Sequence, residues 1–205
     1  MYRVLLTGFT PFGEFRSNPT QTIVEQFNAG LSGVAVYCCV LPVNFRTVPA
    51  YYQRVLQSVK PHFILNLGLA GGSGVIQPEK AAFNIGYDRQ NTGSFTLIAQ
   101  APDAYFTALP VEELATALSH RQLPAVASYY AGSYLCNMLY FQSLHWCSYL
   151  RHSRALFMHL PLHTEAAAQA CMQERKAYAS LPLPMLQEAV VYTIEWGVAY
   201  VKSDE

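Results

Sequence analysis

Charged residues are scarce in this sequence, and neither sign is in excess. They make up 13% of the 205 residues, with 13 lysines and arginines against 13 aspartates and glutamates, whereas roughly a quarter is usual for a soluble domain. No basic run is present, so the electrostatic surface that nucleic-acid binding requires is missing. Nucleic acid and anionic membranes are therefore excluded as expected partners. Hydrophobic residues reach 52%, and this excess favours burial in a homo-oligomer.

Long apolar runs are missing as well. The N-terminal stretch MYRVLLTGFTPFG has an apolar segment too short for the core of a signal peptide, and glycine and proline interrupt it. No stretch reaches the roughly 20 apolar residues of a membrane span. We therefore expect a cytoplasmic protein that makes no contact with a membrane.

Cysteines are present, but their number and spacing do not suit a disulfide network or a zinc site. Five cysteines are an odd set, and no C-x-x-C spacing occurs, which argues against both a disulfide network and a zinc site. Reduced thiols in a cytosolic protein are the simplest interpretation. The five are Cys38, Cys39, Cys136, Cys147 and Cys171.

Predicted strands and helices alternate along the chain. Short apolar runs predict strands, and apolar spacing of three and four residues predicts helices. The expected strands cover 2–8, 33–43, 62–68, 78–85, 125–128 and 155–160; the expected helices cover 19–27 after the cap Asn18, 46–59, 111–120, 134–150 and 183–201. This order predicts one α/β domain over residues 1–205, an α/β/α sandwich with a mostly parallel, twisted central sheet.

The active site of such a sheet forms at the carboxyl ends of its strands. The loops of interest therefore follow Gly8, Gly68, Ser128 and Leu160. The loop GLAGGSG after the third strand lacks the spacing of a dinucleotide fingerprint or a P-loop, so a pocket-shaping loop is favoured over a nucleotide site. In HLPLHTE, the proline between the two histidines argues against a helix that would direct both at a metal.

Cys136 is either an inert core thiol or a nucleophile. Free cysteine is usually buried and inert. Ser133 is expected to cap the following helix, however, and this cap would place Cys136 in the first helical turn, where free amides and the dipole favour a thiolate. A nucleophile also needs a base and an acceptor that orients the base. His159 at a strand end and Glu79 beside the glycine loop are the candidates.

Four ordered motifs resemble those of the pyroglutamyl-peptidase I family. They are TGFTPFG followed by Asn18–Pro19, GLAGG followed by IQPEKAAFNI, AGSYLCN, and ALFMHLP. The segment PDAYFTALPVEEL between the second and third motifs is also similar. The resemblance spans nearly the whole chain, and the order of four motifs is more specific than any one of them.

The resemblance implies a cysteine peptidase that removes N-terminal pyroglutamate from peptides through a thioester acyl-enzyme. It assigns Cys136 as nucleophile, His159 as base and then acid, and Glu79 as the group that supports the imidazolium. Arg89 corresponds to an arginine that assists at the oxyanion, together with the backbone amide of Cys136. No metal or organic cofactor is implied, and family members often assemble as dimers or tetramers.

The resemblance also implies an apolar pocket for the flat, uncharged lactam ring. The expected pocket residues are Phe9, Phe12, Asn18, Tyr134 and Leu135. For Phe9 and Phe12, plain core packing is the alternative.

Several positions depart from the family pattern and bear on substrate preference. Leu69 replaces a glutamine, Lys80 replaces an arginine, YDRQNTG surrounds Arg89 with an altered loop, and His163 lies in a changed segment after the catalytic histidine. Two alternatives stay open on this basis. One is a cysteine amidase for another small blocked N-terminus, and the other is a catalytically weak binding homologue.

Overall fold

The computed structural model describes residues 1–13, 15–88, 93–150 and 152–204. Within these residues the central sheet has five strands in the order β2-β1-β3-β9-β4. Four strands are parallel, and β4 at the edge runs antiparallel to β9. The strands are β1 (Tyr2–Phe9), β2 (Val34–Leu41), β3 (Phe63–Leu69), β4 (Gln77–Glu79) and β9 (Arg154–Leu160).

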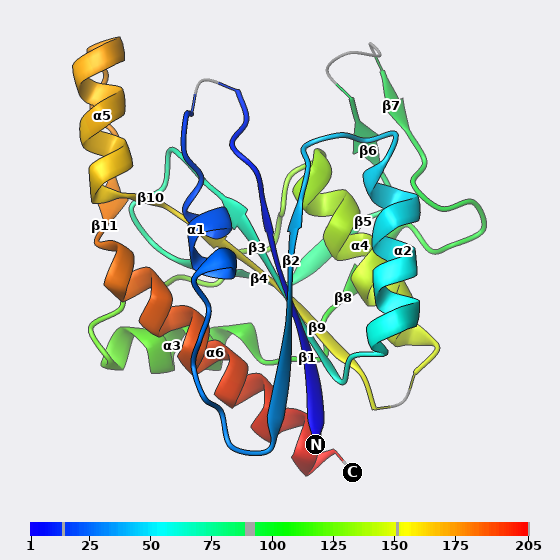
Figure 1. The fold of residues 1–205 in the computed structure, drawn as a ribbon. Helices are drawn as coiled ribbons and strands as arrows, with labels where there is room; N and C mark the ends of the chain where they lie inside the picture. Colours follow the sequence, from blue (N-terminus) through cyan, green and yellow to red (C-terminus); the bar gives the residue numbers. More distant parts are fainter. Residues whose placement is uncertain (14, 89–92, 151, 205) are drawn as a thin grey trace.

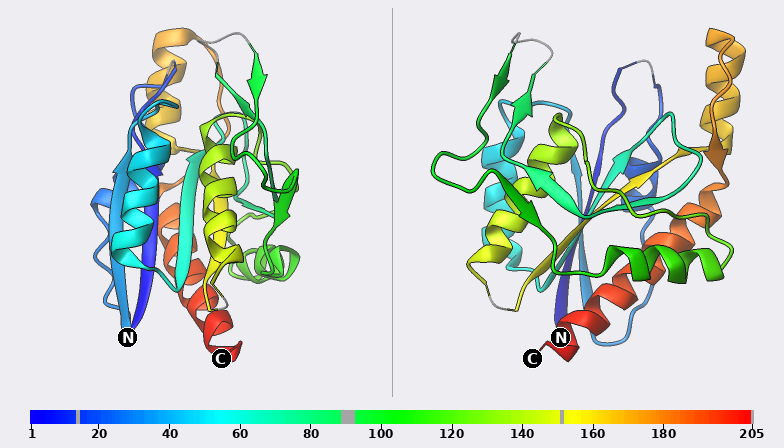
Figure 2. Two further views of the ribbon diagram at one scale, coloured as in Figure 1. Left: turned by 90° about the vertical axis from the view of Figure 1, so that its right-hand side faces the viewer. Right: turned by 180° about the vertical axis from the view of Figure 1, so that it is seen from behind.

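Helices cover both faces of this sheet (Figures 1 and 2). One face packs against α1 (Pro19–Glu25), α3 (Val111–His120) and α6 (Leu183–Ser203). The other packs against α2 (Val48–Val59) and α4 (Leu135–Ser148). Successive strand residues face opposite sides, so Val4 and Leu6 join the first core and Leu5 the second. The predicted α/β/α sandwich is confirmed.

Several elements project from the end of the molecule to which β3 and β9 point (Figure 1). They are the hairpin of β6 (Gly86–Tyr87) and β7 (Ser94–Phe95), and α5 (Thr164–Glu174) with the short pair β10 (Leu162–His163) and β11 (Ser180–Leu181). The sequence did not predict them, because α5 (TEAAAQACMQE) has no stripe of large apolar residues at helical spacing and the strands are only two residues long. No helix in the described part of the chain has the length and apolarity needed to cross a membrane.

The expected strand over 78–85 is wrong, because two strands replace it. β4 joins the central sheet, whereas β5 (Ala81–Phe83) pairs with β8 (Ala104–Phe106) in a separate ladder. The chain changes partner at Lys80, whose Nζ donates to the carbonyls of Thr107 and Leu109 at 3.0 and 3.2 Å. This separation brings Glu79, the last residue of β4, beside β9.

The expected strand over 125–128 is also wrong, and Pro78 explains why. Parallel bridges join Ile76 to Ala125 and Glu79 to Ser128. The amides of Val126 and Ser128 donate to the carbonyls of Ile76 and Pro78. Proline has no N–H with which to continue the ladder between these points. The segment therefore makes two isolated bridges instead of a strand.

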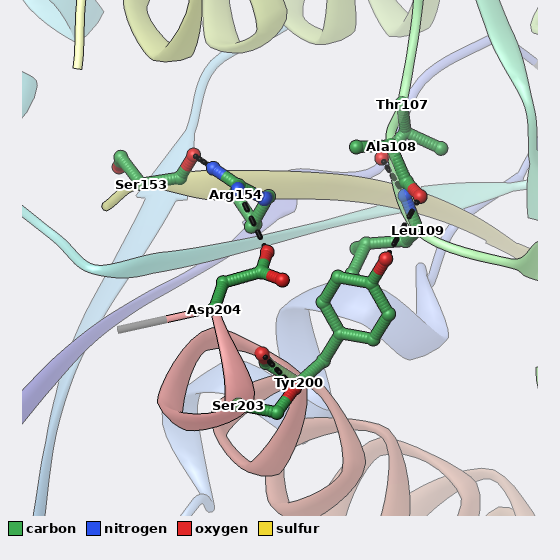
Figure 3. A network of polar contacts seen from close by, with 8 residues as sticks. All are labelled: Thr107, Ala108, Leu109, Ser153, Arg154, Tyr200, Ser203 and Asp204. Carbon is green, nitrogen blue, oxygen red and sulfur yellow. Dashed lines mark hydrogen bonds and ion pairs between the residues drawn. The ribbon is translucent and has the colours of Figure 1, made fainter. Parts of the chain in front are cut away.

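The opposite end of β9 carries a polar network that holds the C-terminal helix (Figure 3). Arg154, the first residue of β9, places Nη2 2.7 Å from Oδ2 of Asp204, the residue that caps α6. The hydroxyl of Tyr200, one turn earlier, donates to the carbonyl of Ala108 at 3.4 Å. These contacts tie the end of α6 to the first residue of β9 and to the segment before α3, at the end of β9 opposite its carboxyl end.

Candidate active site

Cys136 is the second residue of α4, so it lies in the first turn of the helix as expected. The residue that caps this helix is Tyr134, whose backbone is extended, and not Ser133 as predicted. The Ser133 carbonyl instead accepts a hydrogen bond from the Tyr87 amide at 2.7 Å. The correction shifts the helix start by one residue, and Cys136 remains next to amides that have no partner within the helix.

The Cys136 thiol packs directly against the carboxyl end of β3. A Cβ atom added to Gly68 would lie 3.0 Å from Sγ of Cys136 and 2.6 Å from the ring of Phe157. Any side chain at position 68 would therefore displace the thiol or the ring. Gly68 pairs with His159 in the parallel register of β3 and β9, so the close approach also brings the thiol to the histidine strand.

Glu79 and His159 form a hydrogen-bonded pair between β4 and β9. Gln77 lies opposite His159 in the antiparallel register, so Glu79, two residues later, lies on the same face of the sheet. The His159 Nδ1 and Glu79 Oε1 atoms are 2.6 Å apart. The Glu79 side chain is only 2% exposed and that of His159 is 12% exposed. Water therefore screens this pair little.

The pKa of His159 is raised from its ordinary value of 6.5 to about 9. Burial alone would lower this pKa, but hydrogen bonds and negative charge from Cys136 and Glu79 outweigh that effect. With Nδ1 bonded to Glu79, the ring leaves Nε2 for the thiol. The arrangement stabilises an imidazolium beside the sulfur at neutral pH.

Glu79 Oε2 is buried and has no hydrogen-bond partner in the described part of the chain. The carboxylate thus makes a hydrogen bond to His159 through Oε1 and to no other described side chain. Its backbone carbonyl is held separately by the Tyr140 hydroxyl, which donates to it at 2.8 Å from α4. Helix α4, which carries Cys136, and strand β4, which carries Glu79, are joined by this bond.

Asn137, next to the cysteine, fastens the segment that follows β5. Its Nδ2 donates to the carbonyls of Phe83 and Ile85 at 2.9 and 2.8 Å, and its Oδ1 accepts from the Phe83 amide at 2.8 Å. The side chain is fully buried. Sequence reasoning missed both Asn137 and Tyr140. For Asn137, the available signal was a polar residue in a predicted helix made mostly of apolar residues.

An open cavity of about 700 Å³ lies over the thiol and the histidine. Its wall comes from the loop after β1, the ends of β2 and β3, and the residues before α4. The lining residues are Thr10, Pro11, Phe12, Gly13, Val43, Leu69, Ala131, Tyr134, Cys136 and His159. Apart from His159, none of these carries a charge, so the cavity suits an uncharged group near the thiol.

The five expected pocket residues fall into three different places. Phe12 and Tyr134 line the cavity. Phe9 and Leu135 are 2% and 1% exposed and pack in the core cluster between the sheet and α4. Asn18 caps α1, accepting from the Thr20 amide at 3.0 Å.

Asn18 also shapes the first loop, because its Nδ2 donates to the Thr10 carbonyl at 3.3 Å. Arg89 lies outside the described residues. Sequence reasoning did not single out Thr10, Val43 and Ala131, since nothing in their residue types marks them as cavity wall.

The described residues include no group of three or more metal-ligating side chains that could hold an ion. In the HLPLHTE segment, Nδ1 of His163 lies 2.8 Å from Oε2 of Glu165 at the start of α5. His159 faces Glu79 instead. The two histidines of the segment thus serve separate partners.

Nearly the whole chain matches the model of one protein family. The model of the pyroglutamyl peptidase family covers residues 2–200. The chain therefore belongs to the pyroglutamyl peptidase family, and it is an enzyme of that peptidase class, as the sequence motifs predicted.

Individual relatives agree with this membership. The pyrrolidone-carboxylate peptidase of Coprothermobacter proteolyticus is 34% identical over 206 residues, covering 95% of this chain and 96% of that one. That of Thermococcus litoralis is 33% identical, covering 100% of this chain and 96% of the relative. A solved structure of the pyrrolidone carboxyl peptidase from Thermococcus litoralis superposes with a TM-score of 0.91 at 32% identity, covering 100% of this chain and 97% of that one.

Proposed function

We propose that the enzyme hydrolyses the amide bond after an N-terminal pyroglutamyl residue with Cys136, His159 and Glu79 as a catalytic triad. The observation that carries the proposal is the 2.6 Å contact between His159 Nδ1 and the buried Glu79. Cys136 lines the same cavity as His159 and contributes to the raised pKa of that imidazole. Membership of the pyroglutamyl peptidase family supports the substrate class.

Acylation begins with the Cys136 sulfur attacking the pyroglutamyl carbonyl carbon. His159 Nε2 holds the proton that the thiol has given up, and Glu79 stabilises the resulting imidazolium through Nδ1–H. As the tetrahedral intermediate collapses, the C–N bond breaks and His159 donates its proton to the leaving amine. The shortened peptide departs, and a thioester joins pyroglutamate to the sulfur.

Deacylation uses the same groups in reverse. His159, now neutral, takes a proton from a water molecule that attacks the thioester carbonyl. The C–S bond breaks, the proton passes to the sulfur or stays on the imidazole, and pyroglutamate leaves. A base that acts later as an acid needs an orienting partner throughout, and the buried position of Glu79 supplies one.

The oxyanion formed in both steps needs donors. The Cys136 amide at the start of α4 is one, because the first amides of a helix have no helical acceptor and carry the positive end of its dipole. We assign Arg89 as a second, on the resemblance alone.

The cavity supports an uncharged acyl group. Phe12 and Tyr134 provide aromatic walls for the lactam ring, while Phe9, Leu135 and Asn18 act from behind the wall by packing and by fixing the first loop. A free N-terminal amine would need a carboxylate here, and none of the lining residues is one. An uncharged, blocked N-terminus such as pyroglutamate therefore fits this cavity better than a free amine does.

A pyroglutamyl fluorogenic amide tests the proposal directly. Wild-type protein should release the fluorophore, and Cys136→Ala should reduce release by about 10⁴-fold or more because the nucleophile is gone. Cys147→Ala is the matched control from the same helix, since burial raises the pKa of that thiol to about 12 and keeps it inert. Activity that persists in Cys136→Ala would overturn the assignment of the nucleophile.

A cysteine amidase for another blocked N-terminus is the second candidate, and Leu69 in the cavity wall favours it. A panel of amides with pyroglutamyl, acetyl and formyl groups separates the two. A weak binding homologue is separated by iodoacetamide, which should alkylate Cys136 much faster than Cys147 in a working peptidase.

We also infer a homo-oligomer in the cytoplasm. Large apolar side chains such as Phe106, Val126 and Tyr130 are 57% to 64% exposed, and assembly would cover such surface. Light scattering of the purified protein measures the assembly state, and cell fractionation the location.

A further inference from the structure

Phe12 is a cavity wall that stands on an irregular loop. The loop after β1 contains the glycine Gly13, whose φ is +63°, and none of the described residues of this loop belongs to a strand. A wall that contacts a substrate needs support from behind to hold one position. The residue behind Phe12 is Phe15, whose amide donates to the Phe12 carbonyl at 3.2 Å. Their rings meet edge to face with centroids 6.4 Å apart.

Phe15 is itself held between two other parts of the chain. On one side is Gly71, in the glycine loop after β3, where an added Cβ would lie only 2.5 Å from Cζ of Phe15. On the other is Tyr178, between α5 and β11, with ring centroids 5.6 Å apart and an interplanar angle of 70°. All three aromatic residues, Phe12, Phe15 and Tyr178, also pack against a small hydrophobic core. Its members are Leu69, Leu162, Ala166 and Ala167.

We propose that Phe15 is a positioning residue that sets the location of Phe12 and so controls substrate affinity. The role rests on the proposed function, because it concerns the same cavity. Gly71 is glycine in this view because the Phe15 ring occupies the space of a side chain. Through its contact with Phe15, the glycine loop also holds Phe12 of the neighbouring loop in place, in addition to shaping its own side of the cavity.

The proposal predicts an effect on KM that leaves kcat unchanged. The candidate catalytic groups Glu79, Cys136 and His159 stand on β4, α4 and β9, whereas Phe15 contacts the first loop, the glycine loop and the segment after α5. Moving Phe12 therefore alters the fit of the acyl group without moving the reacting atoms. Loss of this kind of apolar fit weakens recognition by about tenfold.

Two adjacent glycines provide a matched pair of variants. In Gly71→Ala the new methyl must push the Phe15 ring aside, which a side-chain tip can do without unfolding the protein. In Gly72→Ala the methyl meets nothing within 4 Å. We expect Gly71→Ala to raise KM for the pyroglutamyl amide about tenfold with kcat within twofold, and Gly72→Ala to match wild type. Phe15→Ala, which removes the support without a clash, should also raise KM.

Equal kinetics in the two glycine variants would overturn the proposal, as would a fall in kcat at constant KM in Phe15→Ala. Protection of Cys136 from iodoacetamide by free pyroglutamate gives an independent measure of affinity. Weaker protection in Gly71→Ala than in Gly72→Ala supports the positioning role even if no amide is hydrolysed. Absence of turnover by wild-type protein would instead contradict the proposed function.

Discussion

The two ends of strand β9 carry two pairs of opposite charge with almost the same geometry. At the amino end, Arg154 and Asp204 approach to 2.7 Å, and at the carboxyl end, His159 and Glu79 approach to 2.6 Å. The surroundings differ. The first pair has side chains 22% and 35% exposed, whereas the second has 12% and 2%. Distance alone therefore says little about what each pair does.

The comparison shows that the role of each pair depends on how deeply it is buried and on whether its cation can lose a proton. Arginine stays charged under all ordinary conditions, so the exposed pair only fastens α6 to the sheet and is weakened by solvent and salt. Histidine can gain or lose its proton, and the buried Glu79 biases that choice strongly. The same strand thus ends in a fastening contact at one side and in a group suited to proton transfer at the other.

The largest difference between the two ends should come from removing the negative charge of each pair. Glu79→Gln keeps the shape and an acceptor for His159 Nδ1–H but cannot support an imidazolium. We expect kcat/KM for a pyroglutamyl amide to fall by about 10² to 10⁴-fold. The measurement is steady-state kinetics on the purified variant.

A folding control accompanies Glu79→Gln. Because Oε2 of Glu79 has no described partner, the new amide group breaks no second hydrogen bond. Circular dichroism and thermal unfolding should show a folded protein. Activity within threefold of wild type would contradict the supporting role of Glu79.

Much of this architecture could be predicted from the sequence because local patterns determine it. Apolar runs gave the four parallel strands and the long helices, since a sheet covered on both faces needs nearly continuous apolar strands. The placement of Cys136 in a first helical turn also followed from local signals. The position of β4 could not be predicted in this way, because it depends on pairing with β9, a strand far along the sequence. The missing N–H of Pro78 beside 125–128 likewise matters only once those segments are neighbours.

The cavity wall shows a second limit. Leu135 and Tyr134 are adjacent, yet one is buried in the core and the other lines the cavity. Tyr134 has an extended backbone and Leu135 is the first helical residue, so their side chains point in different directions. The sequence placed the cap at Ser133 instead of Tyr134. The roles of Glu79, Cys136 and His159 stay predictions until the variants are measured.

The next effect concerns pH and protein stability. A folded-state pKa of about 9 for His159 lies above its ordinary value of 6.5. The folded protein therefore binds more proton than the unfolded chain between these values. The stabilisation is complete below about pH 6.5, and it is lost as pH rises through about 9. The free energy of unfolding should decline across this interval by at most about 1.4 kcal/mol per pH unit.

Urea unfolding at several pH values measures this slope. Glu79→Gln should flatten it, because one of the two groups that raise the pKa of His159 is then uncharged. Asp204→Asn is the control that should leave the slope intact, since Arg154 does not titrate in this range. A slope that is equal in wild type and Glu79→Gln would show that the buried pair does not govern the proton on His159.

The smallest effect should follow when the exposed pair is broken. Asp204→Asn removes the partner of Arg154, and we expect unfolding free energy to fall by less than about 1 kcal/mol, because exposed ion pairs contribute little. Asp204 also lies at the end of α6, where the helix dipole disfavours an acid, so loss of its charge partly offsets loss of the pair. Added salt should shrink the difference further, and kcat/KM should equal that of wild type. A large loss of activity would mean that the fastening at the amino end of β9 reaches His159 at the other end, and the two ends would then have to be treated as one unit.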